Sequence, residues 1–441
     1  MDNKLQAELK QYMRVWAEEG RFSGSVMVAQ GESVLLHEGY GYANLEFCIP
    51  NTASTKYNIA SVTKMFTAVA VMQLYEQGKL DLEDSLAEYV PEYIHAGAVT
   101  LHHLLASLSG IPDYTGLPEY NVRIPLAVPE ILDWLNRYPL QAEPGTQADK
   151  SNSNYILLAM VVERVSGMPL EEYFKCMLFE PLGLTSTGVC YNEDVIPGKA
   201  CGYSYSGEGA VRAEYYEQTG AYGSGYLYSS AEDLLKWVRA LENGVIITAD
   251  SYRKMTTPYG YLWYIEASSG YGCFVKNNPV DEMFMDGNIY GYTCTVRSHS
   301  CRNTVFIVLG NNDAIAISRL VQGLQAIVFA QPVSGPIRPQ TTEIADWERY
   351  RHLTGKYVFP PMDWSFTISL EHGRLQVDRL FIQRARREKF RLGLVAEAED
   401  SVTFACEVCD STYVFRKNTA DHDFQADYLF DALKLTYVRT I

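Results

Sequence analysis

The sequence predicts an α+β domain over residues 1–330, a linker over residues 331–345 and a small all-β domain over residues 346–441. The length of 441 residues is about three times that of a typical domain, which favours two domains. Three prolines and a glycine concentrate in the linker, where the composition changes. Hydrophobic residues make up 47% of the chain and charged residues 20%, which is typical of a large globular core and excludes a largely disordered chain.

Strands are expected at both ends of the first domain. Residues 24–29 and 33–37 are apolar runs on either side of a Gln-Gly-Glu turn, which predicts a β-hairpin. Residues 293–297 and 304–310, near the end of the domain, have the same strand-like composition. Strands first, helices between and strands last predict a single sheet built from both ends of the domain.

Helices are predicted where apolar residues recur at helical spacing between local start and stop signals. Ser61 and Ser230 precede two of them as N-cap candidates, while Gly78 and Gly167 follow two as stops. The expected helices are an amphipathic one at the N-terminus that contains residues 5–16, then 61–77, 154–166 and 231–243.

The second domain shows short alternating runs separated by turn residues, at 366–370, 374–377 and 401–405, which predict strands. Cys406 and Cys409 form a lone C-x-x-C within a strand-like run. Because that spacing puts the two side chains on opposite faces of a strand, we interpret them as buried structural thiols.

Charge and cysteine content restrict the partners and the compartment. Lys and Arg number 37 against 53 Asp and Glu, a net charge of −16, so nucleic acid and anionic membranes are not expected as partners. No apolar stretch of about 20 residues is present, and the N-terminus lacks the features of a signal peptide. Nine scattered cysteines favour reduced thiols. We therefore expect a cytoplasmic protein, and the sequence leaves its oligomeric state open.

Several common motifs are absent. The chain has no G-x-S-x-G, no H-E-x-x-H and no G-x-x-x-x-G-K-[ST], which argues against an α/β-hydrolase elbow, a zinc site of that type and a phosphate loop. We accordingly expect no metal and no cofactor.

Ser61 and Lys64 form the pattern S-x-x-K at the start of a mostly apolar predicted helix. Residues three apart lie on the same helix face, so the two side chains can meet. A buried lysine has a lowered pKa and can accept the proton of a neighbouring hydroxyl, which activates the serine as a nucleophile. Alone, this pattern arises by chance in many chains, and a plain N-cap serine with a surface lysine is the alternative.

The surroundings of this pattern resemble the serine β-lactamase and penicillin-binding protein superfamily, and within it the class C β-lactamase-related hydrolases and esterases. The resemblance covers roughly residues 20–325. Residues 346–441, which open on Leu353-Thr-Gly-Lys-Tyr, resemble the lipocalin-like β-domain of many relatives. The blocks that carry the first resemblance are Phe22–Ala29, Gly39–Glu46, Tyr57–Ala68, Gly78–Asp84, Leu104–Pro112, Pro144–Thr146, Phe179–Leu184 and Gly223–Leu234.

This resemblance implies a β-lactamase/transpeptidase-like fold, with an antiparallel sheet, flanking helices and a helical subdomain, followed by a barrel-like domain. It also implies three catalytic elements, of which Ser61 and Lys64 are the first. The second, Tyr-x-Asn, falls on Lys150-Ser151-Asn152, so that Asn152 matches and Lys150 replaces the tyrosine. Tyr155 corresponds to a helix tyrosine of the family and not to the catalytic one.

The third element, Lys-Thr-Gly or His-x-Gly, falls on Asp286-Gly287-Asn288, so an aspartate replaces the usual cation or imidazole. The resemblance then makes the backbone N–H groups of Ser61 and Ile289 the oxyanion hole. It makes Asp286, Gly287, Asn288 and Tyr290 the residues that bind the substrate.

The two replacements change the electrostatics of the expected site. Asp286 would repel a substrate carboxylate by roughly 4 kcal/mol at 4 Å for an effective dielectric near 20, which disfavours β-lactams and D-Ala-D-Ala peptides. A neutral or amine-bearing substrate is allowed. Because Lys150 and Asp286 have opposite charges on facing walls, we predict that they pair. Lys150 then either replaces tyrosine as the proton shuttle or is locked in the pair, with slow or lost hydrolysis.

The leading hypothesis is a serine hydrolase that forms an acyl-Ser61 intermediate on an ester or a peptide-like amide. The alternatives are an acyltransferase or peptide cyclase that uses the same acyl-enzyme, and a non-catalytic binding protein with a degraded site. A small-molecule or peptide-like substrate is expected in each case. Five tyrosines in or beside cleft segments suggest an aromatic or extended ligand, namely Tyr203, Tyr205, Tyr222, Tyr226 and Tyr290.

Overall fold

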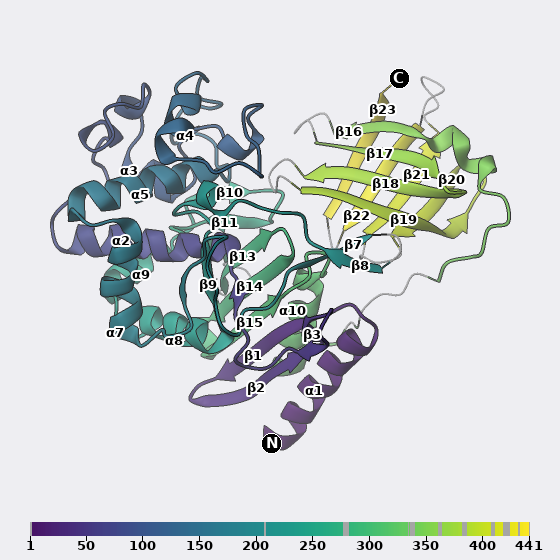
Figure 1. Ribbon diagram of the computed structural model, residues 1–441, viewed down its shortest axis with the longest axis horizontal. Coiled ribbons are helices and arrows are strands. Elements are labelled where there is room, and N and C mark those ends of the chain that lie inside the picture. The colour runs from purple at the N-terminus through teal and green to yellow at the C-terminus, as the bar shows by residue number, and fades with distance from the viewer. Residues whose placement is uncertain are drawn as a thin grey trace.

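The computed structural model shows a mixed α/β domain joined to a closed β-barrel (Figure 1). It describes residues 2–440 apart from 207–208, 277–281, 334, 336–339, 360–363, 382–385, 407–410, 418–423 and 431–432. Within the described residues, no helix is both long enough and apolar enough to cross a bilayer. The predicted linker bounds stay a prediction, since part of that segment lies outside the described residues.

An eight-stranded antiparallel sheet forms the centre of the first domain, in the order β10-β11-β12-β13-β14-β15-β1-β2. The N-terminal hairpin pairs with the last strand of the domain, so the expectation of one sheet built from both ends is confirmed. The strands are β1 (Gly24–Gln30), β2 (Ser33–Tyr40), β10 (Gly260–Leu262), β11 (Ala267–Ser269), β12 (Phe274–Lys276), β13 (Glu282–Ile289), β14 (Tyr292–His299) and β15 (Thr304–Gly310).

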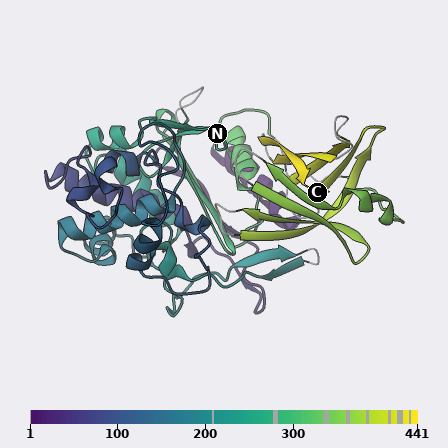
Figure 2. The ribbon, with the colours of Figure 1, turned by 90° about the horizontal axis from the view of Figure 1, so that it is seen from above.

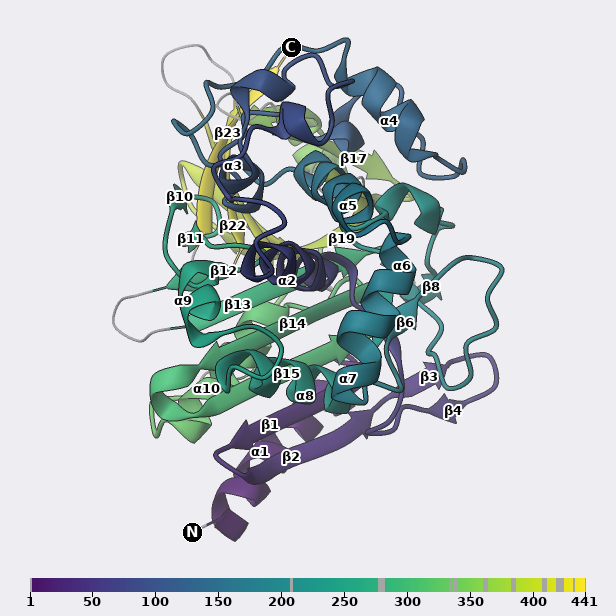
Figure 3. The same cartoon turned by 90° about the vertical axis from the view of Figure 1, so that its left-hand side faces the viewer.

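Helices cover both faces of this sheet because its strands are apolar on both sides. In β1, Val26 and Val28 pack under α1 (Asp2–Glu18) and α10 (Ile317–Val328). The alternate residues Met27 and Ala29 belong to the larger core on the opposite face, under α2 (Thr63–Glu76), α5 (Asn152–Ser166) and α8 (Ala231–Glu242). Figure 3 shows α2 lying against the sheet, with α5 beside it. The central strands β1, β14 and β15 are therefore buried on both faces, as for a central layer.

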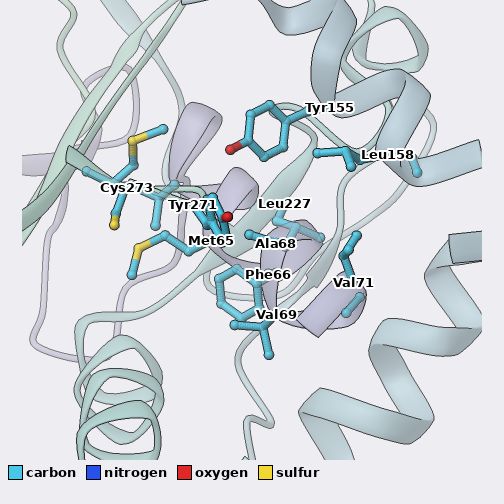
Figure 4. Close-up of a cluster of buried hydrophobic side chains, with 14 of the residues drawn as sticks. Met65, Phe66, Ala68, Val69, Val71, Tyr155, Leu158, Leu227, Tyr271 and Cys273 are labelled. Carbon is cyan, nitrogen blue, oxygen red and sulfur yellow. The ribbon is translucent and has the colours of Figure 1, made fainter. Parts of the chain in front are cut away.

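The core around α2 is dense and aromatic. Figure 4 shows side chains of α2 directed towards α5 and towards the segment that carries Leu227. Phe66 stacks on Trp237 of α8 with ring centroids 4.0 Å apart. This packing holds α2 between the sheet and the helices, and so fixes the position of the residues at its N-terminal end.

The predicted start and stop signals agree with the structure at most helix ends. Gly78 and Gly167 take positive φ angles of 64° and 72° just after α2 and α5, and Ser230 caps α8 through the Asp233 N–H at 3.3 Å. The predicted N-cap role of Ser61 is wrong. Ser61 lies in a 3₁₀ turn, η1 (Ala60–Val62), before α2, and Val62 is the residue that precedes the helix.

The remaining elements form a helical subdomain and small peripheral sheets. The helices are α3 (Leu101–Leu105), α4 (Val128–Leu135), α6 (Leu170–Tyr173), α7 (Glu180–Leu182) and α9 (Ala249–Met255). The strands are β3 (Tyr42–Asn44), β4 (Ile49–Pro50), β5 (Tyr57–Asn58), β6 (Gly188–Val189), β7 (Tyr203–Ser206), β8 (Gly209–Arg212) and β9 (Leu227–Ser229).

The C-terminal domain is a closed eight-stranded antiparallel barrel, which confirms the barrel-like prediction. Its interior is filled by aromatic and aliphatic side chains, with Tyr357 stacked on Phe366 at 5.1 Å. Cys406 is buried at the end of β20, whereas Cys409 lies outside the described residues. The strands are β16 (Gly355–Phe359), β17 (Trp364–Glu371), β18 (Arg374–Phe381), β19 (Arg386–Glu397), β20 (Ser401–Cys406), β21 (Ser411–Lys417), β22 (Phe424–Phe430) and β23 (Leu433–Thr440).

The two domains meet along one side of the barrel, as the view from above shows (Figure 2). The β7–β8 hairpin reaches under the barrel, and Tyr205 of β7 packs against the barrel core. At the end of the predicted linker, the Thr342 N–H donates to the Leu394 carbonyl of β19 at 2.7 Å.

Candidate active site

Ser61 is presented by a strained turn between the sheet and α2. Ala60, directly before it, has a φ of +45°, a conformation that is unusual for a residue other than glycine. On the sheet side, η1 packs against β13 at Gly287, where a Cβ would collide with the Ile59 carbonyl oxygen. The Cys294 thiol of β14 also donates to this carbonyl, at 3.1 Å. The turn that carries Ser61 is thus held against the sheet by two neighbouring strands, β13 and β14.

Lys64 lies one turn after Ser61 and is almost fully buried, with 2% of its surface exposed. Its Nζ lies 3.0 Å from Ser61 Oγ, 2.7 Å from Asn152 Oδ1 and 2.8 Å from the Ser224 carbonyl oxygen. The Tyr155 ring lies beside it, 5.5 Å from Nζ to the centroid. The structure therefore brings together three residues that the sequence predicted, Ser61, Lys64 and Asn152.

The orientation of the Asn152 amide is set by Asp113. Asp113 Oδ2 accepts hydrogen bonds from the backbone N–H of Asn152 at 3.1 Å and from its Nδ2 at 2.9 Å. Because a carboxylate accepts and does not donate, Nδ2 must face Asp113, which leaves Oδ1 to face Lys64. Asp113 is in turn held by the backbone N–H and the hydroxyl of Thr115.

The pKa of Lys64 is lowered well below the ordinary lysine value. Burial is the largest cause because it removes water from the charged form, and the positive charge of Lys150 is the next. The negative charge of Asp113 acts in the opposite direction. The balance favours a neutral amine beside the Ser61 hydroxyl.

Lys150 lies in the loop that leads into α5, close enough to Lys64 for the effect just described. Its backbone N–H donates to the Tyr264 hydroxyl at 3.2 Å, and that hydroxyl donates to Asp149 Oδ1 at 2.8 Å. The Asp149 N–H donates to the Ser107 carbonyl at 2.9 Å. The loop that carries Asp149 and Lys150 is therefore held by hydrogen bonds to Tyr264 and to Ser107.

The third predicted element lies on β13, beside η1. Gly287 is required for the close approach to Ile59, Asn288 accepts a hydrogen bond from the Thr293 hydroxyl at 3.2 Å, and Ile289 is buried. Tyr290 occupies the turn that follows and stacks on Tyr216, with centroids 5.6 Å apart. β12 pairs with only the first three residues of β13 among the described strands, so the rest of that edge faces η1.

Asp286 has partners on the neighbouring strand that the sequence analysis did not foresee. Its Oδ1 accepts from the Thr295 hydroxyl at 2.5 Å, and Arg297 Nη2 lies 3.4 Å from the same oxygen. Arg297 is buried and also contacts Glu282 at 3.2 Å. Burial acts to raise the pKa of Glu282, but Arg297 and Gln325 lower it overall.

Arg297 changes the expected electrostatics of this wall. Asp286 already has a counter-charge on β14, so the repulsion calculated for an isolated aspartate does not apply in full. Pairing of Asp286 with Lys150 stays a prediction.

Asp113, Ser224, Tyr264 and Arg297 were missed by sequence reasoning. Asp113 directly follows the Leu104–Pro112 block and Ser224 lies inside the Gly223–Leu234 block, so proximity to these blocks was a usable signal. Tyr264 and Arg297 carry no local signal, because only the fold brings them to Lys150 and Asp286.

The tyrosines predicted to line the cleft serve mostly as packing. Tyr226 is fully buried and packs against Tyr222 at 5.5 Å. Tyr203 is also buried, and Tyr205 lies against the barrel. Of the five, Tyr290 follows β13 directly and lies next to the site. Among the described residues, no group of three acidic, histidine or cysteine side chains is placed to hold a metal ion.

Comparison with known proteins identifies the family of the chain. Residues 5–319 match the family described as Beta-lactamase, which is well over half of the chain. The chain belongs to the beta-lactamase family. The predicted superfamily is thereby confirmed, together with its α/β domain.

Relatives within this family include penicillin-binding proteins. The chain is 32% identical over 259 residues to the putative penicillin-binding protein PbpX of Bacillus subtilis, a match that covers 58% of this chain and 65% of that protein. It is 27% identical over 389 residues to penicillin-binding protein 4* of the same organism, covering 81% and 84%. The octameric penicillin-binding protein homologue from Pyrococcus abyssi superposes with a TM-score of 0.65 at 25% identity, over 98% of this chain and 99% of that one.

Proposed function

We propose that this chain is an active-site-serine hydrolase that forms an acyl-enzyme on Ser61 and cleaves an ester or a peptide-like amide. The contacts of Lys64 carry the proposal. A neutral amine has two N–H groups and one lone pair. Two of its three neighbours, Asn152 Oδ1 and the Ser224 carbonyl, can only accept hydrogen bonds. They take the two N–H groups, and the lone pair is left for the Ser61 hydroxyl at 3.0 Å.

In the proposed acylation step, Lys64 Nζ takes the proton of Ser61 Oγ while Oγ bonds to the substrate carbonyl carbon. The carbonyl oxygen becomes an oxyanion that accepts from the Ser61 N–H and from an N–H of β13. The bond to the leaving group then breaks, and the leaving atom takes a proton from the Lys150 ammonium in place of the tyrosine of relatives. Water later attacks the ester of Ser61, returns a proton to Lys150 and releases the acid, while Lys64 reprotonates Ser61.

The hydrogen-bonding pattern between β13 and β14 indicates which N–H of β13 is the second oxyanion donor. The sequence predicted the Ile289 N–H, but Ile289 pairs with Tyr292 across a two-residue turn. The residues that flank such a turn bond to each other, and N–H groups of a strand alternate between its two edges. We therefore assign the donor to Asn288, whose N–H is directed to the edge that faces η1.

The charges on β13 favour a substrate without a strongly acidic group beside Asp286. Asp286 and Glu282 both pair with the buried guanidinium of Arg297. Two carboxylates against one guanidinium leave this group of three side chains with a net charge of −1. A neutral ester or amide, or one with an amine at this end, is the substrate class that suits this wall.

The decisive experiment is the intact mass of the protein after incubation with a fluorophosphonate, in parallel with a panel of activated esters. We expect one adduct per chain, with fluoride displaced by Ser61 Oγ, and no adduct on the Ser61→Ala variant. Absence of an adduct on the wild-type chain between about pH 6 and 10 would refute the hydrolase and leave a binding protein with a degraded site.

A further inference from the structure

The contact between the barrel and the α/β domain includes a cluster of aromatic rings. Trp263 and Tyr264 follow β10, and the rings of Phe359 and Trp364, at the facing ends of β16 and β17, pack against them. Trp263 stacks on Trp364 with centroids 6.5 Å apart, and Tyr264 meets the Trp364 ring edge-on at 6.1 Å. This aromatic bridge, defined as Trp263, Tyr264, Phe359 and Trp364, joins one end of the barrel to the β10–β11 turn.

The same Tyr264 is the residue that ties down the loop of the second catalytic element. Its ring contacts the barrel, while its hydroxyl donates to Asp149 and accepts from the backbone N–H of Lys150. Asp149 is half-buried, and its pKa is raised because burial disfavours the carboxylate, which Tyr264 partly offsets by donating a hydrogen bond. Removal of the Tyr264 hydroxyl would take one hydrogen-bond donor from Asp149 and one acceptor from the Lys150 N–H in a half-buried place.

We propose that the C-terminal barrel helps to position Lys150 for proton transfer, with Tyr264 as the positioning residue that connects the two. This inference rests on the proposed function, because it assigns Lys150 a place in that reaction. Trp364 restricts the Tyr264 ring, the Tyr264 hydroxyl fixes the backbone at Lys150, and the Lys150 charge acts on Lys64. The barrel is therefore part of the active-site support.

A change in the position of Lys150 should change the pKa of Lys64, and this change can be measured as a shift in the pH dependence of acylation. The charges that act on the Lys64 amine are those of Lys150 and Asp113. Its uncharged neighbours are the Tyr155 ring, the Asn152 amide, the Ser61 hydroxyl and the Ser224 carbonyl. Lys150 disfavours the ammonium form of Lys64, so its withdrawal raises the pKa of Lys64. Since the amine must be neutral to act as a base, the acidic limb of the acylation rate then moves to higher pH.

The test compares Tyr264→Phe and Trp364→Ala with the wild-type chain. The reaction of Ser61 with a fluorophosphonate, in which Oγ bonds to phosphorus and fluoride leaves, is followed against pH as the measure of acylation. Hydrogen exchange is followed in peptides that span residues 145–152. We expect acylation slower by several-fold to about 10²-fold, an acidic limb displaced to higher pH, and faster exchange at Lys150 in both variants.

Two matched variants control for general effects. Tyr259→Phe removes a neighbouring hydroxyl that donates to the Lys254 carbonyl at 3.0 Å, and Trp347→Ala removes a barrel tryptophan that stacks on Phe404. Both should keep the wild-type pH profile and the wild-type exchange at 145–152. Tyr264→Phe keeps the ring contacts, so it remains informative if Trp364→Ala fails to fold.

The outcomes separate this inference from the proposed function. Wild-type rate, profile and exchange in Tyr264→Phe would overturn the role of Tyr264, and the same result in a folded Trp364→Ala would overturn the role of the barrel. Failure of the wild-type chain to acylate would refute the proposed function instead. The exchange measurement would then still decide whether the barrel holds the Lys150 loop.

Discussion

The two walls of the candidate site are built on different principles. The nucleophile wall consists of Ser61, Lys64, Asn152, Asp113 and Ser224. In this wall the Lys64 amine contacts the Asn152 amide, whose orientation is fixed by Asp113. The strand wall consists of Asp286, Gly287, Asn288, Tyr290 and Arg297, and it combines a tight backbone contact with an ion pair between Asp286 and the buried Arg297.

This difference shows which features of the site tolerate change. The lone pair of Lys64 depends on two acceptors, so loss of either acceptor would misdirect it. On the strand wall, the proposed oxyanion donor is a backbone N–H, which survives changes of the side chain. Under the proposed function, the negative charge of Asp286 is compatible with catalysis because Arg297 lies beside it as a counter-charge.

The largest effect is expected from Lys64→Met on the nucleophile wall. Methionine fills the volume but cannot accept the Ser61 proton, so the acylation rate should fall by about 10²–10⁴-fold. Intact mass after timed incubation with a fluorophosphonate measures the rate. Lys4→Met, at an exposed position on α1, is the control and should react as the wild type does. If Lys64→Met reacts within a few-fold of the wild-type rate, Lys64 is not the base that activates Ser61.

Arg297→Met tests the charges of the strand wall. The substitution leaves Glu282 and Asp286 without their buried counter-charge, which should lower the unfolding free energy by about 3–5 kcal/mol. Urea denaturation measures it. Arg253→Met removes an exposed pair with Asp250 and should cost no more than about 1 kcal/mol. Equal costs for the two substitutions would show that the Arg297 cluster does not behave as a buried one.

Gly287→Ala tests the backbone contact between the two walls. The new Cβ would push η1 away from β13, which should cost about 1–3 kcal/mol of stability and also slow acylation of Ser61. Urea denaturation and the acylation rate are measured on the same samples. Gly97→Ala, at a position with open space around it, should change neither quantity. A stable, fully reactive Gly287→Ala would mean that the close approach does not hold Ser61 in place.

Lys150→Met should give the smallest change in stability and the most specific change in pH dependence. Removal of the Lys150 charge favours the ammonium form of Lys64 and so raises the pKa of Lys64. The acidic limb of the acylation rate should therefore move to higher pH. Asp113→Asn removes a charge of opposite sign and should move the limb downwards. Displacement of both limbs in the same direction would contradict this electrostatic account.

Most of the framework of this site could be predicted from local sequence signals. Gly78, Gly167 and Ser230 end or start helices through their own backbone or hydroxyl, so each signal lies within a few residues of its effect. The turn at Ser61 could not be predicted, because the strain at Ala60 is maintained by packing of η1 on β13.

The charged partners could not be predicted for a similar reason. Arg297 reaches Asp286 because the pairing of β13 with β14 places Asp286 opposite Thr295. The local sequence predicts neither the register of these two strands nor which face each side chain occupies. Asp113 lies 39 positions before Asn152 and meets it only after the helical subdomain has folded. Contacts of this kind depend on tertiary packing and are visible only in the structure.

The most direct test of the account is the pH dependence of Ser61 acylation in the wild-type chain, measured by intact mass with a fluorophosphonate whose own reactivity is constant with pH. If a neutral Lys64 activates Ser61, the rate rises with pH to a plateau, with a midpoint well below the ordinary lysine pKa of about 10.4. A rate that still rises through that value, or one that keeps the same profile in Lys64→Met, would contradict the account.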